Sequence, residues 1–253
     1  MESAVDLTRY RSALDRSSPI VAMGRVTKVA GFVTEADGPA TQLGGICHIY
    51  PANLPRVKAE VLGFRDNRVL LVPLGEIRGI APGNRVVARD QDASIEVGDG
   101  LLGRVIDGLG NPIDGKGPVL CRAAYPLYTN PINPLLRKRI NQPLDLGIRA
   151  INGVLTVGCG QRMGIFAGSG VGKSVLLGMI ARNTTADVNV IALIGERGRE
   201  LNDFIQKELG EEGLKRSVVV VATSDHLPLV RMRGAFIATA IAEYFRDQGK
   251  HVI

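Results

Sequence analysis

The chain has 253 residues, of which 45% are apolar and 22% charged, enough for one large domain or two smaller ones with a sizeable core. The first twenty residues carry charges without an apolar centre, and the longest strongly apolar run, Val218–Ala222, is far too short to cross a membrane. We therefore expect a cytoplasmic protein without a signal peptide or a transmembrane helix.

Two further properties exclude whole classes of function. The net charge of +6 comes from scattered basic residues, with Arg137–Arg139 the only tight cluster, and aromatic residues make up only 4% of the chain. A base-stacking surface for nucleic acid is therefore not expected. The cysteines are few and widely separated, which fits neither a disulfide framework nor a C-x-x-C metal pattern, so we expect no cysteine metal site. They are Cys47, Cys121 and Cys159.

The first 18 residues place Leu7, Tyr10 and Leu14 at helical spacing among charged side chains. A short amphipathic helix that docks on a partner fits this pattern, and so does a frayed, solvated tail. An isolated helix of this length is marginal in water unless its apolar stripe packs on something. Both alternatives stay open.

Residues 19–93 are expected to form a small antiparallel β domain. Short β-rich runs follow one another here, with Gly, Pro, Asp and Asn between them. The intervals are too short for crossover helices, so we expect a barrel or a sandwich, and the few aromatic residues favour a structural role. The runs are Val21–Ala30, Gly45–Tyr50, Val57–Phe64, Val69–Pro73 and Arg85–Ala88. Residues 90–145 are rich in Gly and Pro and are expected to be a connecting layer.

The stretch Arg162–Ser174 is predicted to be a phosphate-binding loop. Met163–Phe166 is typical of a buried strand, glycines follow it, and Lys173 and Ser174 open an apolar helix face. The helix N-terminus favours phosphate oxygens, Lys173 adds a positive charge for the β- and γ-phosphates, and the Ser174 hydroxyl is the expected Mg²⁺ ligand. Ala167 replaces the first glycine of the usual motif, but a simple glycine turn would need no Lys-Ser at the helix start.

Strands and helices alternate beyond the loop, which predicts an α/β fold with a parallel sheet, flanking helices and a ligand at the carboxyl ends of the strands. The predicted order is strand 163–166, helix 173–182, strand 188–194, helix 199–209, strand 217–222, helix 229–247 and a further strand starting at 251. The sequence ends within an apolar run, so we expect residues essential to the chemistry beyond Ile253. We also expect poor cover over Leu193, Val219 and Val221.

Charged residues follow the strand predicted at 188–194. Glu196 and Arg197 lie between glycines directly after it. A carboxylate at this place can polarise a water for attack on a γ-phosphate, and an adjacent arginine can hold phosphate oxygens. A solvated charged turn fits the same pattern. Position alone leaves both alternatives open.

Several stretches together resemble one family, the ATPases of bacterial type III protein export, which are relatives of the catalytic subunit of rotary ATP synthases. The resemblance runs from about residue 19 to the end. Its stretches are Ile106–Asp114, Gly147–Gly153, Gly160–Arg162, Gly168–Ser174, Gly195–Glu200 and Glu243–Gly249. The loop Gly168–Ser174 and an Asn-Leu-Pro near residue 53 look more similar to the flagellar member than to the virulence-injectisome member, which is the alternative.

The resemblance implies an enzyme, a Mg²⁺-dependent ATPase that energises type III protein export for flagellar assembly. It implies a barrel at 19–93 that forms a ring, a homo-hexamer, and a RecA-like nucleotide-binding domain at 94–253 that is incomplete at its C-terminus. The tail at 1–18 would bind a regulatory stalk protein. The other implied partners are the export gate, chaperones and export substrates, with the subunit peripheral to the membrane at most.

The resemblance also implies roles for single residues. Glu196 matches a water-activating carboxylate, Arg197 a phosphate contact, Glu200 a carboxylate near the Mg²⁺ waters and Arg231 a weaker phosphate contact. Lys173 joins Glu196 and Arg197 in the implied catalytic set. The nucleotide-binding set is Gly168, Ser169, Gly170, Val171, Gly172, Lys173, Ser174, Val175 and Arg231, and the metal set is Ser174 and Glu200. A second Mg²⁺-holding Asp, an arginine finger and an adenine-stacking aromatic have no match in this sequence.

Two rivals belong to other classes. A ring-shaped RNA translocase shares this core, but it would want aromatic residues in the barrel and would show salt-sensitive RNA binding. A non-catalytic ring subunit would bind nucleotide only structurally and would need no carboxylate at Glu196. The scarcity of aromatic residues argues against the first rival, and the presence of Glu196 argues against the second.

Overall fold

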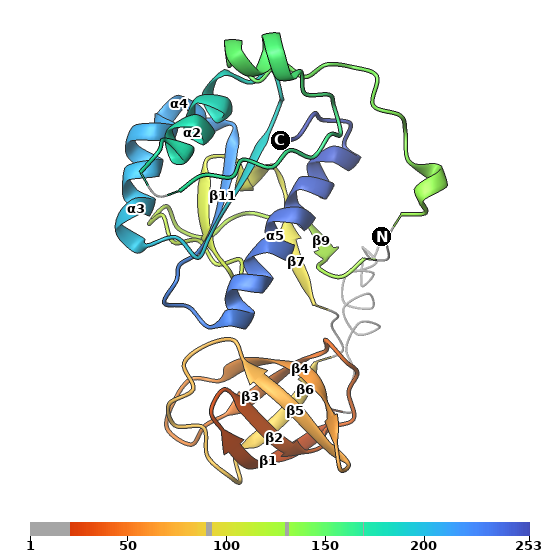
Figure 1. Ribbon diagram of the computed structural model, residues 1–253. Helices are drawn as coiled ribbons and strands as arrows, with labels where there is room; N and C mark the ends of the chain where they lie inside the picture. The colour runs from red at the N-terminus through yellow and green to blue at the C-terminus, as the bar shows by residue number, and fades with distance from the viewer. Residues whose placement is uncertain (1–20, 90–92, 130–131, 169) are drawn as a thin grey trace, which may run out of the picture. The chain divides into compact units, whose positions relative to one another are not determined.

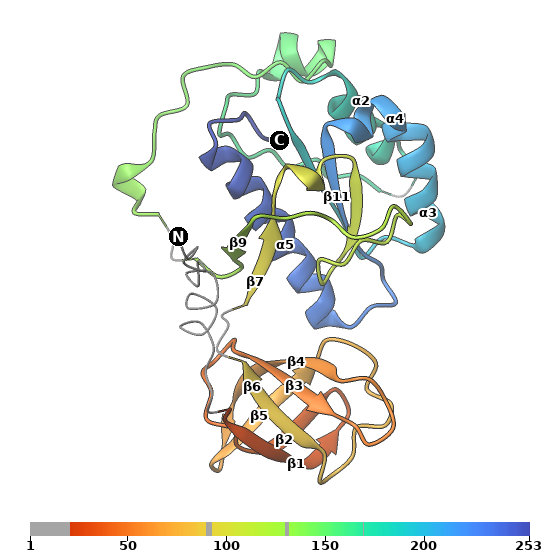
Figure 2. The ribbon, with the colours of Figure 1, turned by 180° about the vertical axis from the view of Figure 1, so that it is seen from behind.

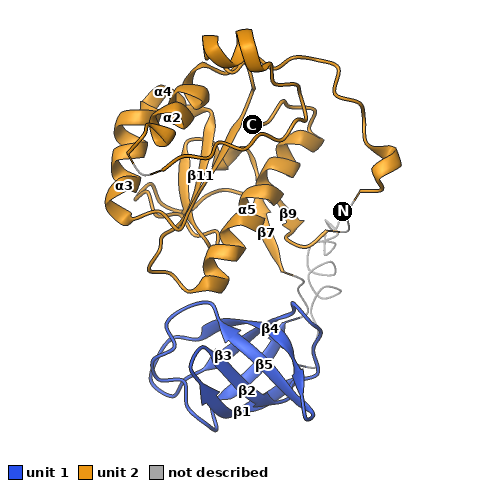
Figure 3. Cartoon of the chain, in the orientation of Figure 1, with its two compact units in different colours: residues 1–92 blue, residues 93–253 orange. Residues whose placement is uncertain are grey.

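The computed structural model describes residues 21–89, 93–129, 132–168 and 170–253 (Figures 1 and 2). The tail helix predicted within residues 1–18 lies outside these ranges. Two compact units make up the chain, residues 1–92 and residues 93–253 (Figure 3). None of the described helices is long and apolar enough to cross a membrane.

The first unit is a closed, antiparallel barrel with the strand order β1-β2-β5-β4-β3-β6. Its strands are β1 (Met23–Ala30), β2 (Val33–Asp37), β3 (Ile46–Tyr50), β4 (Val57–Arg65), β5 (Arg68–Pro73) and β6 (Arg85–Arg89). Inward-facing apolar side chains from all six strands fill the barrel. The predicted antiparallel domain is confirmed, and closure decides for a barrel over a sandwich.

Strand β2 was not among the predicted runs. Its two buried residues are Thr34 and Ala36, whose side chains are 1% and 0% exposed. A small side chain and a polar one give little apolar alternation, so the strand pattern in the sequence is weak. Pairing decides the structure, because Thr34 lies opposite Val29 of β1 on one side and opposite Leu71 of β5 on the other.

The second unit contains a three-stranded parallel sheet with the order β10-β11-β8. Its strands are β8 (Arg104–Asp107), β10 (Asn189–Ile194) and β11 (Ser217–Ala222), and a separate antiparallel pair joins β7 (Ser94–Val97) to β9 (Ala123–Pro126). The predicted parallel sheet is confirmed. The expectation that residues 90–145 form only a connecting layer is wrong, because three strands lie there. Each has four residues, too few for a clear sequence pattern, and forms through its partner strand.

Helices cover both faces of this sheet. Figures 1 and 2 show β11 between α5 on one side and α2, α3 and α4 on the other. The helices are α2 (Lys173–Asn183), α3 (Gly198–Asp203), α4 (Gly210–Lys215) and α5 (Pro228–Asp247), with the π-helical η4 (Phe204–Leu209) between α3 and α4. Short helical turns are η1 (Asp99–Leu101), η2 (Pro134–Leu136) and η3 (Ile151–Leu155).

The helix predicted at 199–209 is wrong in extent and kind. Three successive segments, α3, η4 and α4, run from residue 198 to residue 215. Apolar spacing predicts helix, but it does not predict the wider π-helical turn. That turn places Phe204 and Leu209 in the core, where they are 4% and 0% exposed.

The face of the sheet covered by α2 and the α3–α4 segment is well buried. Leu193, Val219 and Val221 are only 8%, 0% and 3% exposed. They pack with Phe204 and Leu209 from η4 in one cluster. The expectation that these three sheet residues would be poorly covered is therefore wrong, because the helical connection after β10 folds back over them.

Residues 163–166 do not form the predicted strand. Phe166 is 97% exposed, and residues 251–253 lie beside the start of β10. The Ile253 N–H donates to the Val188 carbonyl at 3.0 Å, and the Val190 N–H donates to the Ile253 carbonyl at 2.8 Å. Among the described residues, the apolar run before the phosphate loop pairs with no strand. The strand expected from residue 251 does begin to pair, in parallel, with β10.

A buried ion pair anchors β8. Two guanidinium nitrogens of Arg104 donate to the two carboxylate oxygens of Asp114 at 2.7 and 2.8 Å, and these side chains are 11% and 7% exposed. The Val105 and Lys116 N–H groups also donate to Asp114. The Arg104 hydrogen bonds, with smaller help from the backbone donors, hold the pKa of Asp114 far below its usual range. The pair therefore stabilises the fold above the unfolded carboxyl pKa of about 4.

Asp114→Asn should lower the free energy of unfolding by about 3 kcal/mol, because it leaves the Arg104 charge buried without a counterion. The measurement is urea unfolding at neutral pH. The matched control is Glu212→Gln, which breaks the exposed pair between Lys215 and Glu212 and should cause no measurable change. As the pH falls through the native pKa of Asp114, the parent should lose its advantage over Asp114→Asn. Equal stability of both variants at neutral pH would contradict a stabilising role for the buried pair.

Candidate functional site

The phosphate loop ends where α2 begins at Lys173. Gly170 and Gly172 take left-handed backbone angles, with φ of 76° and 96°, a conformation that favours glycine. The Leu176 N–H donates to the Gly172 carbonyl at 2.9 Å, which starts the helix directly after the glycines. Ser169 lies outside the described residues. The loop therefore faces the unpaired N–H groups of a helix N-terminus, the arrangement that binds phosphate.

The structure brings two of the predicted catalytic residues together. The Lys173 ammonium nitrogen lies 3.6 Å from the nearer carboxylate oxygen of Glu196, and the two side chains are 41% and 36% exposed. Lys173 comes from the first turn of α2, and Glu196 follows the carboxyl end of β10 after Gly195. An exposed ion pair of this kind is weak in water, so either partner can exchange the other for a ligand at small cost. The pair marks the carboxyl edge of the sheet as the candidate site.

The other charged residues of the β10 turn contact each other. The Arg197 guanidinium lies 3.5 Å from a Glu200 carboxylate oxygen, and both side chains are about half or more exposed. Among the described residues, no hydrogen bond or ion pair joins either of them to Lys173 or Ser174. Their predicted roles toward phosphate and Mg²⁺ therefore stay predictions.

Arg231 occupies the first turn of α5, close after the carboxyl end of β11. Its Nε atom is buried and has no hydrogen-bond partner within the described structure. A buried guanidinium N–H without an acceptor is costly, and a phosphate oxygen would satisfy it. Together with exposed Ser174 and Val175 on the first turn of α2, this orphaned donor fits an anionic ligand at this edge of the sheet.

The turn after β11 also reaches the site, and sequence reasoning missed it. The Ser224 N–H donates to the backbone carbonyl of Glu196 at 3.1 Å. Within the turn, the Thr223 N–H donates to Nδ1 of His226 at 3.0 Å. The sequence signal available was a Thr followed three residues later by a side chain able to accept a hydrogen bond, at the end of an apolar strand.

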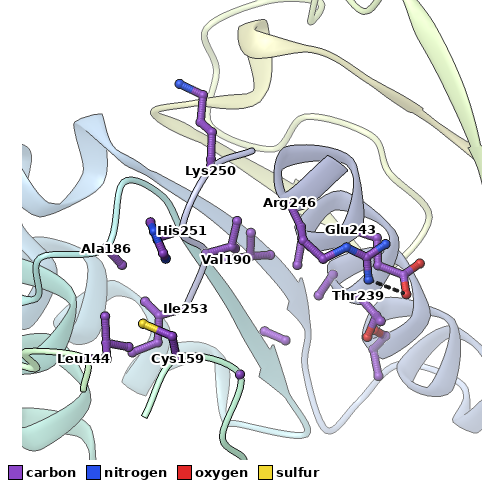
Figure 4. A pocket seen from close by; sticks show the side chains of 16 residues that line it. Leu144, Cys159, Ala186, Val190, Thr239, Glu243, Arg246, Lys250, His251 and Ile253 are labelled. Atoms are coloured by element: carbon purple, nitrogen blue, oxygen red, sulfur yellow. Dashed lines mark hydrogen bonds and ion pairs between the residues drawn. The ribbon is translucent and has the colours of Figure 1, made fainter. Parts of the chain in front are cut away.

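Two cavities lie elsewhere in the second unit. One cavity has a volume of about 650 Å³ and lies beside β10. Figure 4 shows Val190, Thr239 and His251 among the side chains that line it. Arg246 pairs with Glu243 there at 3.7 Å. A second, more apolar cavity of about 530 Å³ lies between α2, β10 and the segment before the phosphate loop. None of the described residues lining either cavity belongs to the ion pair at the site, so neither cavity is the phosphate site.

Two family models match this chain. The nucleotide-binding domain of the ATP synthase alpha/beta family matches residues 147–253, and the beta-barrel domain of the same family matches residues 26–89. The chain belongs to the ATP synthase alpha/beta family. The barrel model matches within the first unit and the nucleotide-binding model within the second.

The relatives of this family member include export ATPases of two kinds. The flagellum-specific ATP synthase of Bacillus subtilis is 52% identical over 234 residues, 91% of this chain and 53% of the relative. The type 3 secretion system ATPase of Xanthomonas euvesicatoria is 45% identical over 247 residues, 96% of this chain and 56% of the relative. The chain thus spans about half the length of the curated relatives it matches. The resemblance to the type III export ATPases is confirmed.

A solved structure supports the same fold. EscN, the ATPase of the enteropathogenic E. coli type III secretion system, was solved assembled with its central stalk EscO. It matches this chain with a TM-score of 0.83 at 46% identity, over 90% of this chain and 56% of EscN. The predicted architecture, a barrel followed by a RecA-like nucleotide-binding domain, is confirmed.

Proposed function

We propose that this chain is part of an ATPase that energises type III protein export for flagellar assembly. The observation that carries the proposal is the 3.6 Å approach of Lys173 to Glu196 at the start of α2, in a member of the ATP synthase alpha/beta family. The flagellar relative from Bacillus subtilis is 52% identical and the secretion-system relative from Xanthomonas 45%, which favours the flagellar system over an injectisome.

The chemistry is attack of water on the γ-phosphorus of ATP, with cleavage of the bond to the bridging oxygen of ADP. The N-terminus of α2, the loop N–H groups from Gly168 to Gly172 and Lys173 stabilise charge on the phosphate oxygens. Glu196 accepts a hydrogen bond from the attacking water and orients it. The ion pair supports this division of roles, because Lys173 can leave Glu196 for a phosphate and so free the carboxylate for water. Arg197 and Arg231 are the proposed further phosphate contacts.

The proposed metal is Mg²⁺, held by the Ser174 hydroxyl with Glu200 near its bound waters. The described residues contain no cluster of three His, Cys, Asp or Glu side chains that would form a complete metal cage. This fits Mg²⁺, which keeps several waters and is usually bound through one or two protein groups plus substrate phosphates. When bound, it would neutralise charge on the phosphates.

The proposed assembly is a homo-hexameric ring on the cytoplasmic side of the membrane. The support is that EscN, 46% identical to this chain, was solved in an assembled form with a central stalk. We propose that the barrel closes the ring, that the tail at 1–18 binds a regulatory stalk protein, and that the export gate, chaperones and export substrates are the other partners.

The natural full-length protein should release phosphate from Mg²⁺-ATP, and this rate should be unchanged by added RNA. A ring-shaped RNA translocase would instead show RNA-stimulated hydrolysis that falls with salt. Steady-state phosphate release with and without single-stranded RNA is the measurement. A lack of ATP hydrolysis by the assembled protein would contradict the proposal, and RNA stimulation would favour the translocase.

A further inference from the structure

The backbone of Glu196 is held by the neighbouring strand end. The Gly195 N–H donates to the Ala222 carbonyl at 2.7 Å, and the Ser224 N–H donates to the Glu196 carbonyl at 3.1 Å. The pairing of β10 with β11 therefore continues past both strands, up to the proposed catalytic carboxylate. The position of Glu196 depends on the turn that carries Ser224.

That turn is closed by hydrogen bonds between Thr223 and His226. The Thr223 N–H donates to His226 Nδ1 at 3.0 Å, the Thr223 hydroxyl lies 2.9 Å from the same nitrogen, and the His226 N–H donates to the Thr223 carbonyl at 3.1 Å. A side chain that reaches back to the N–H three residues earlier is the geometry of a capping box, in which Glu or Gln is usual. Here the acceptor is the imidazole nitrogen Nδ1 of His226.

Thr223 and His226 differ in burial, and this difference shows what each contributes to the turn. Thr223 is only 8% exposed, so its N–H is shielded from water and needs an acceptor within the protein. His226 is exposed. Its ring therefore contributes an acceptor atom to the turn. Because the ring is exposed, a substitution removes this acceptor and little buried apolar surface.

We infer that His226 is a positioning residue for Glu196. The link runs from His226 Nδ1 to the Thr223 N–H, through one peptide unit to Ser224, and from the Ser224 N–H to the Glu196 carbonyl. Without the acceptor, the Thr223 N–H turns toward another partner, the turn opens, and the carboxylate loses its place beside Lys173. This inference rests on the proposed role of Glu196 in ATP hydrolysis. A displacement of about 1 Å at a catalytic group can cost up to about 100-fold in rate.

The test compares His226→Leu, which keeps bulk without an acceptor, with His226→Gln, whose side-chain carbonyl can accept from the Thr223 N–H. In the full-length ATPase, His226→Leu should lower kcat about 10-fold with KM for ATP changed less than about twofold. His226→Gln should restore most of the lost kcat. In thermal unfolding both variants should stay folded at the assay temperature, with His226→Leu less stable than His226→Gln because its shielded Thr223 N–H has lost its acceptor.

Glu196→Gln is measured in parallel, and the double variant Glu196→Gln with His226→Leu should be no slower than Glu196→Gln alone. Parent-like kcat in His226→Leu, an equal fall in both His226 variants, or a change in KM alone would each overturn the inference. If Glu196→Gln is impaired while His226→Leu is not, the inference fails and the proposed function stands. If Glu196→Gln hydrolyses ATP at the parent rate, the proposed role of Glu196 fails, and the inference fails with it.

Discussion

Glu196→Gln in the full-length protein is expected to slow ATP hydrolysis by about 100-fold or more, the scale of general-base contributions, while ATP still binds. The amide keeps the size of the side chain and can still contact Lys173, 3.6 Å away in the parent. It lacks the basic carboxylate that would orient the attacking water. Steady-state phosphate release measures the chemistry, and titration calorimetry with ATP measures the binding.

The matched control for this variant is Asp203→Asn, in the last residue of α3. Its carboxylate is exposed and pairs with Lys207, four residues away. Asp203 therefore lies in the helix that follows Glu196, but its ion pair is not with a residue of the candidate site. Asp203→Asn should hydrolyse ATP at the parent rate. Parent-like turnover of Glu196→Gln would mean that Glu196 belongs only to a solvated charged turn.

Lys173→Ala in the full-length protein is expected to weaken ATP binding by about 10- to 100-fold, the scale of a hydrogen bond to a charged group. The residue opens α2 directly after the glycines, so its ammonium group is the positive charge at the helix start, where the triphosphate is expected to bind. Its removal leaves Glu196 without its cation, but that carboxylate is 36% exposed and water can solvate it. The fold should therefore persist, and calorimetry should report a loss of affinity alone.

Lys207→Ala is the control for this second variant, because Lys207 is an exposed lysine paired with Asp203 away from the loop. Its ATP affinity should equal that of the parent. Unchanged ATP affinity in Lys173→Ala would refute the assignment of the triphosphate to this loop.

Much of the second unit was predictable from local patterns. The strand at 217–222 and the helix starts at 173 and 228–229 agree with the structure to within a residue. Continuous apolar runs predict buried parallel strands, and spacings of three and four predict the long helix α5, because burial on one face imposes these periods. The glycines with Lys173 and Ser174 predict the loop, because phosphate binding needs a bare backbone and a cation at a helix start.

The sequence by itself determined the strands at 188–194 and 217–222 and the helices that start at 173 and at 228–229, since these depend on neighbours within a few residues along the chain. Only the tertiary structure decided that β2 and β8 are strands and that residues 163–166 are not, because a short strand exists through the backbone hydrogen bonds of its partner. The candidate site also depends on the tertiary structure, because its residues come from different elements. The sequence leaves Glu196 open between a solvated turn and a catalytic base, and the sheet brings it to 3.6 Å from Lys173, 23 residues away in sequence. The hydrogen bond from Ser224 to its backbone arises because parallel strands end at one edge, which no local pattern encodes.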